Sequence, residues 1–198
     1  MIFIRKYLFF YTLSILILLC GCNNLLLEEK KIPKKLNENV FYKGKFSVNY
    51  LRENKKFNFQ GSFDWDQKKN HTKIKINSLL GQTIFRVDVF PNNLIFKSVK
   101  GKQFKFETNE EIPLEILGWP FPVKILKNTL QGFIIDEKGK AIPVNAKEKK
   151  NFLLNGWNVK FISWKINSYG NFPKRISLFK NSDERIKIKL FITSVNIK

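Results

Sequence analysis

Hydrophobic and polar residues alternate along most of the chain from Lys45 onward. In "FNFQGSFDW", apolar side chains and one glycine occupy every second position from Phe57 to Trp65. A period of two places such residues on one face of a β-strand. Similar alternation or turn-bounded apolar runs predict further strands in "KFSVNYL", "KIKI", "TIFRVDVF", "NLIFKSV", "KFKFE", "WNVKFISW", "KRISLF" and "RIKIKLFI". We therefore expect a mainly β protein built from consecutive antiparallel strands.

The alternation stops between residues 108 and 132, where two short helices are predicted. Thr108 or Asn109 can cap the first helix, with Glu110 and Glu111 in its first turn and Gly118 at its end.

The second helix follows in "WPFPVKILKNTLQG". Pro122 suits its first turn, Val123, Leu126 and Leu130 share one side, and Gly132 closes it. Helices inserted among strands would cover one side of a sheet. A sheet of about nine to eleven strands tends to curl, and it could enclose an apolar pocket beneath the helices.

The first 22 residues, "MIFIRKYLFFYTLSILILLCGC", have the layout of a secretory signal peptide. Arg5 and Lys6 precede an apolar run, Tyr7–Leu19, that is shorter than the ~20 residues of a membrane-spanning helix. An uncleaved anchor is the alternative. The ending "LCGC" resembles a bacterial lipobox, which predicts cleavage before Cys22 and lipidation of Cys22. The residue after Cys22 is Asn23, whereas an aspartate at this position would retain the protein at the inner membrane. The absence of that aspartate favours the outer membrane.

These features divide the chain into a signal peptide (1–21), a lipidated N-terminus and tether (22–40) and a single domain (41–198). The 198 residues carry a net charge of +20, with a pI of about 10.0. So large an excess suggests an anionic partner, but the basic residues are spread along the whole chain. Compositional drift is the alternative. Export argues against binding to nucleic acid.

The sequence contains little material for catalysis. Both cysteines lie near the N-terminus, which excludes a disulfide framework for the fold. His71 is the one histidine, and we expect it in a strand or turn rather than at a metal site or in a triad. Asp64 and Asp66 would stand about 7 Å apart on one strand face and are better interpreted as solvated than as an acid pair. We therefore predict no enzyme, catalytic residue, metal site or cofactor.

One turn is unusual. "NSLLGQT" lies between two predicted strands and has two leucines, Leu79 and Leu80, beside Gly81. A turn tip normally sits in water, where polar residues are favoured. The leucines either pack down onto the body or contact a membrane.

Several segments together resemble the LolB family. They are the lipobox at Cys22 and "GKFSV", "GSFDW", "LLGQT", "ILGWPFPVKIL", "GW", "FPKRI" and "RIKIKL", in that order. The resemblance implies a curved antiparallel half-barrel with a helical lid over an apolar cavity for acyl chains. It also implies a protruding loop, here Leu79, Leu80 and Gly81, that inserts into the membrane. Leu79 stands where relatives often have proline.

The resemblance further implies an outer-membrane lipoprotein, anchored at Cys22 and facing the periplasm. It would accept acylated lipoproteins from the periplasmic carrier LolA, insert them among outer-membrane phospholipids, and act as a monomer. Another periplasmic lipid-binding or envelope-assembly lipoprotein with a similar half-barrel is the alternative. The residues expected to line the cavity are Phe46, Val48, Phe57, Phe59, Phe63, Trp65, Phe85, Val87, Trp119, Phe121, Leu126 and Leu130.

Overall fold

In the computed structural model of the chain, the hydrophobic core lies within Lys31–Lys198, the larger of the two units into which the chain divides. The residues that it describes are 35–107, 111–147, 150–168, 170–181 and 185–197. No helix within those ranges is long and apolar enough to cross a bilayer.

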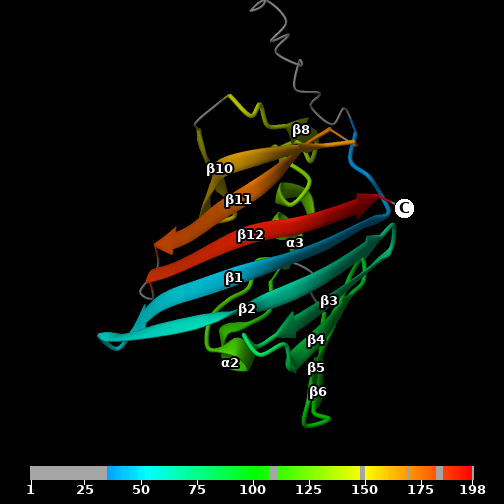
Figure 1. The fold of residues 1–198 in the computed structure, drawn as a ribbon. Coiled ribbons are helices and arrows are strands. Elements are labelled where there is room, and N and C mark those ends of the chain that lie inside the picture. Colours follow the sequence, from blue (N-terminus) through cyan, green and yellow to red (C-terminus); the bar gives the residue numbers. More distant parts are fainter. Residues whose placement is uncertain (1–34, 108–110, 148–149, 169, 182–184, 198) are drawn as a thin grey trace, which may run out of the picture. The chain divides into compact units, whose positions relative to one another are not determined.

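Ten antiparallel strands form the main sheet of the described chain, in the spatial order β6-β5-β4-β3-β2-β1-β12-β11-β10-β9 (Figure 1). The mainly β prediction is confirmed, and the strand number falls within the expected range. The bounds are β1 Val40–Arg52, β2 Lys55–Lys68, β3 His71–Asn77, β4 Thr83–Val89, β5 Leu94–Ser98, β6 Gln103–Phe106, β9 Asn151–Leu154, β10 Trp157–Asn167, β11 Gly170–Asn181 and β12 Arg185–Ile197.

The first and last strands pair at the centre of this sheet. Val40 lies opposite Ile197, and the ladder continues to Tyr50 opposite Ile186. In Figure 1 the blue β1 and the red β12 run side by side. The chain winds outward from β1 to one edge, β6, and returns from the other edge, β9, to β12.

The segment between these two edges is therefore a crossover from β6 to β9. It contains α2 (Leu114–Leu117), α3 (Val123–Thr129) and a hairpin of β7 (Phe133–Ile135) and β8 (Ala141–Pro143). In the view of Figure 1, α3 lies behind β12 and β1, and its Val123 and Leu126 are buried in the core, so it covers one face of the sheet, called here the inner face. This confirms for α3 that an inserted helix covers one side of the sheet.

The second predicted helix is confirmed as α3, with Pro122 at its N-terminus. The first is shorter than predicted. Glu111 precedes α2 rather than forming its first turn, because Ile112 makes two backbone hydrogen bonds to Phe121, of 2.9 and 3.0 Å. Its proposed caps, Thr108 and Asn109, and the adjacent Glu110 lie outside the described residues.

Burial along β2 follows the predicted alternation. Phe63 and Trp65 are buried on the inner face, and the aspartates between and beyond them are half-exposed. Burying each such aromatic contributes about 1.5–3 kcal/mol. Gly61 interrupts the aromatic stripe because any side chain there would overlap the backbone oxygen of Asn77, the last residue of β3.

His71 begins β3, as expected of a strand or turn residue. Its Nε2 lies 2.9 Å from one carboxylate oxygen of Asp88, and the Lys97 ammonium lies 2.9 Å from the other. Burial raises the pKa of Asp88, but hydrogen bonds and charge from Lys97 and His71 outweigh this effect, so that the pKa is lower than usual. The cluster links β3, β4 and β5.

Asp88→Asn is expected to lower the free energy of unfolding by about 1–2 kcal/mol at pH 7. Because the folded-state pKa is depressed, the carboxylate stabilises the fold above about pH 4, its unfolded value. This contribution is lost as the pH falls through the lower folded pKa. Urea titrations should therefore separate the two proteins at pH 7 and converge near pH 2. Asp64→Asn, at an ion pair of 4.0 Å, is the control and should change stability by less than about 0.5 kcal/mol.

Candidate functional site

The residues expected to line a cavity gather on the inner face and in the crossover. Phe59 is half-buried and Phe57 is 40% exposed. The other ten are buried, namely Phe46, Val48, Phe63, Trp65, Phe85, Val87, Trp119, Phe121, Leu126 and Leu130.

The space that these side chains leave is small. A hollow of about 10 Å³ lies between the strands and α3, which is room for about one water molecule at most. Leu126 of α3 and Leu130, which directly follows the helix, fill the rest. Three further residues line the hollow that were not among the predicted cavity residues, Ile74, Ile76 and Leu190, although their alternation with lysines marks them as inward-facing. The inner face is thus apolar but occupied by the chain's own helix.

An aromatic cluster lies at one end of this face. Tyr50 stacks on Phe57 with ring centroids 4.8 Å apart, and Trp119 lies 5.8 Å from Tyr50 and 5.3 Å from Phe59. Within the described residues, the buried Nε1 of Trp119 has no hydrogen-bond partner. A hydrogen bond from this N–H to an incoming acceptor would therefore stabilise the complex that contains it.

Phe57 is exposed because of where β3 ends. The ladder between β2 and β3 runs from Lys68 to Ser62, so the first half of β2 borders β1 on one side and has no described strand on the other. The aromatic cluster lies on this uncovered half. It is open at its margin, where Phe57 is exposed.

The turn between β3 and β4 is short and well defined. Ser78 donates its backbone N–H to Gln82 O at 2.8 Å, and Gly81 donates to Ser78 O at 3.0 Å. Gly81 has φ +82°, a conformation that strains other residues, and nothing lies within 4 Å of its missing side chain. This geometry directs the tip of the turn into solvent.

Both leucines of the turn are in solvent. Leu79 is 72% exposed and Leu80 is 89% exposed. Neither side chain packs onto the body, so the first of the two interpretations of the turn is excluded. The turn begins after Asn77, which pairs with Ser62, three residues or about 10 Å along β2 from Phe59. The exposed leucines and the aromatic cluster therefore share one end of the sheet.

The other residues considered for catalysis, metal binding or lipidation are Asp64, Asp66 and Cys22. Asp64 and Asp66 lie on the outer face of β2, and Asp64 lies 4.0 Å from Lys43. No group of His, Cys, Asp and Glu that could hold a metal occurs in the part of the chain that the structure describes. Cys22 lies outside that part.

Comparison with known proteins gives a consistent result. The family model described as "Outer membrane lipoprotein LolB" matches residues 39–194. Curated relatives described as outer-membrane lipoprotein LolB include one from Cupriavidus necator, 25% identical over 76% of this chain and 77% of its own. Another, from Chromobacterium violaceum, is 26% identical over 92% of this chain and 95% of its own.

Among solved structures, a DUF1329 family protein from Desulfovibrio piger superposes with a TM-score of 0.50 at 8% identity, covering 83% of this chain and 87% of its own. A LolA superfamily protein from Nitrosomonas europaea has a TM-score of 0.46 at 7% identity. At 8% identity, the similarity to the Desulfovibrio piger protein shows a shared fold and nothing about function.

Proposed function

Because the chain belongs to the LolB family of outer-membrane lipoproteins, we propose that its inner face receives the acyl chains of cargo and that Leu80 contacts the membrane during release. The protein accepts lipoproteins from the periplasmic carrier LolA and inserts them into the outer membrane, as a receptor rather than an enzyme. The observation that supports these two roles is the exposed Leu79–Leu80 tip beside an apolar inner face.

The acyl chains of the cargo need shelter from water, since exposed apolar surface costs about 25 cal/mol per Å². The hollow under α3 is too small for them, so the crossover must move for the chains to enter. We infer that they enter at the aromatic cluster, which is already open at its margin. There an ester carbonyl of the cargo would accept the hydrogen bond that the Trp119 indole leaves unmade.

Transfer in this scheme needs no nucleotide. The receptor must bind the acyl chains more tightly than the carrier does, and each 1.4 kcal/mol of difference favours it tenfold. Release follows when the bilayer offers the chains a still larger apolar environment.

The loop and the anchor hold the protein against its membrane. Cys22 is the proposed lipidation site, and mass spectrometry of the processed N-terminal peptide tests it. The loop tip of Leu79 and Leu80, on the turn that Gly81 permits, would contact outer-membrane phospholipid. Leu79 in place of proline makes this tip more apolar and its backbone less restricted. The protein would act as a monomer.

The direct test is transfer of an acylated lipoprotein from purified LolA to this protein at equal concentrations, without nucleotide. Most of the cargo should move to the receptor, and a cargo that lacks its acyl chains should not form a complex. Acylated cargo that stays on LolA would contradict the proposal.

A further inference from the structure

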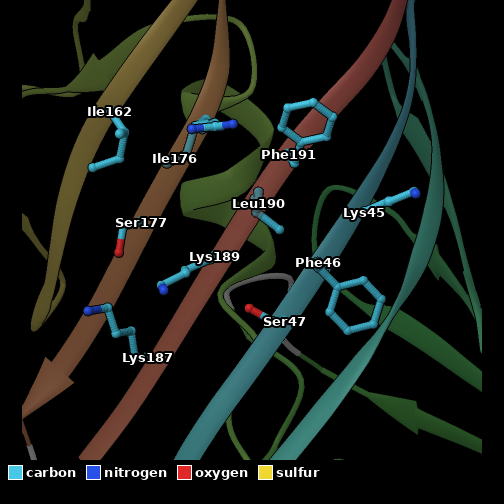
Figure 2. Close-up of a pocket in the computed structure, with 11 residues that line it drawn as sticks. Lys45, Phe46, Ser47, Ile162, Ile176, Ser177, Lys187, Lys189, Leu190 and Phe191 are labelled. Atoms are coloured by element: carbon cyan, nitrogen blue, oxygen red, sulfur yellow. The ribbon is translucent and has the colours of Figure 1, made fainter. Parts of the chain in front are cut away.

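A groove of about 520 Å³ lies on the outer face of the sheet, opposite α3 (Figure 2). It crosses β1, β12, β11 and the middle of β10. Figure 2 shows Lys45, Lys187 and Lys189 on this face, with α3 behind the sheet. Their neighbours in sequence, such as Phe46, Ile188 and Leu190, are buried on the inner face. Phe46 and Leu190 line both this groove and the hollow under α3, so only the thickness of the sheet divides the groove from the proposed acyl-binding face.

Four cationic side chains surround the groove. Lys189 is central, and Lys187 stands two residues along β12, about 7 Å away. Lys45 and Arg175 both lie opposite Phe191, so each is diagonal to Lys189 at about 7–8 Å on the two flanking strands. None of the residues that line the groove is acidic. Like charges this close repel one another, and a bound anion would relieve the repulsion.

The groove also has an apolar part. Ile162 of β10 is 51% exposed, and Phe191 of β12 is half-buried. The Arg175 guanidinium lies 5.5 Å from the centre of the Phe191 ring. Opposite Lys189 on the flanking strands are Ser47 and Ser177, whose small side chains leave the space open. A free inorganic anion would use the cations alone, whereas an amphiphile with a charged ester would use both parts.

We propose that this groove binds the phosphodiester headgroup of an anionic phospholipid. The phosphate lies among Lys187, Lys189, Lys45 and Arg175, and the glycerol part contacts Ile162 and Phe191. Charge-assisted hydrogen bonds to phosphate are among the stronger ones in proteins. An outer-membrane lipoprotein is held beside phospholipid, so even a modest affinity suffices for occupancy. The proposal does not depend on the loop or on acyl-chain binding.

The test uses the processed, lipidated protein anchored in vesicles of phosphatidylcholine, with or without phosphatidylglycerol. The anchor is the same in both, so a difference reports on the headgroup. Lysines are acetylated with an amine-reactive ester and their rates followed by mass spectrometry. Acetylation of Lys187 and Lys189 should slow at least threefold with phosphatidylglycerol, and high salt should remove the effect. Lys138 and Lys140, exposed at the β7–β8 turn, are internal controls and should not change.

Two variants sharpen the test. Arg175→Gln should reduce the protection of Lys189 at least twofold. Arg86→Gln removes the same charge from the exposed face of β4, five strands from β11 in the sheet order, and should leave the protection intact.

Three outcomes would overturn the proposal. Groove lysines could react equally in both vesicles, or inorganic phosphate could protect them as well as the lipid does. Protection by added LolA but not by phosphatidylglycerol would assign the groove to a protein partner instead. Cargo transfer is measured separately in phosphatidylcholine vesicles. If transfer is normal but the groove lysines are not protected, only the headgroup proposal fails, and if transfer itself is absent, the proposed function fails.

Discussion

Leu80→Glu is expected to reduce delivery of lipoproteins to the membrane by at least about tenfold while cargo still moves from LolA to the receptor. The leucine is 89% exposed at the tip of the β3–β4 turn, so the protein itself does not use its apolar surface. Burying a leucine in lipid contributes about 1.5–3 kcal/mol, and 1.4 kcal/mol corresponds to a factor of ten. Glutamate loses this contribution and adds a charge that lipid disfavours.

The control for this variant is Leu153→Glu. Leu153 is 71% exposed on β9, an edge strand of the same sheet, and receives the same change in charge. Both variants should fold, because substitutions at such exposed positions usually change stability by less than about 0.5 kcal/mol. The readout is cargo recovered in vesicles after transfer from preloaded receptor. Equal delivery by the wild type and Leu80→Glu, or equal loss in both variants, would contradict the membrane role of the loop.

Leu126→Ala is expected to lower the free energy of unfolding by about 2–5 kcal/mol in the lipid-free protein. Leu126 is 1% exposed and lines the hollow between α3 and the sheet, so truncation leaves an enlarged apolar space. If acyl chains occupy this face, they should fill the space in the variant. A ligand that binds the folded state stabilises it in proportion to its concentration and affinity. Acylated cargo should therefore restore part of the lost stability.

The matched control is Leu178→Ala in β11. Leu178 is fully buried but does not line the hollow. It should lose a similar amount of stability in denaturant titrations and gain no more from acylated cargo than the wild type does. Equal rescue of both variants, or of neither, would count against acyl chains entering beneath α3.

The period of alternation predicts which side chains point inward, because a strand repeats every two residues wherever it lies in a sheet. It does not predict what covers them. Phe57 belongs to the same stripe as Trp65, yet it is 40% exposed because β3 ends at Asn77. The end of a neighbouring strand is a property of the pairing and not of the stripe.

The sequence predicted the helices and strands of the crossover less well than those of the main sheet. α2 begins later than its acidic run suggests because Ile112 pairs with Phe121, a contact between residues that no helical pattern anticipates. β7 and β8 are three residues each, too short for alternation to identify. Proline and the 3.6-residue spacing were sufficient for α3, where Val123 and Leu126 are buried as expected.

The candidate site was predictable to a similar degree. Two leucines beside Gly81 marked the turn, but their exposure depends on a backbone geometry that only the structure gives. The groove on the outer face could not be predicted from the sequence, because its four cationic residues come from three strands. Lys45 and Lys189 lie far apart in the chain and meet through the ladder between β1 and β12.

That same ladder sets the order in which the chain can fold. Val40 pairs with Ile197, so the middle of the sheet is closed by segments at opposite ends of the domain. Pairings of such long sequence separation form slowly, since a large loop must close before they gain any contact. Until the last strand emerges from its export route, β1 has an unpaired edge that is open to aggregation. The domain therefore completes its fold only after its final residues have been released.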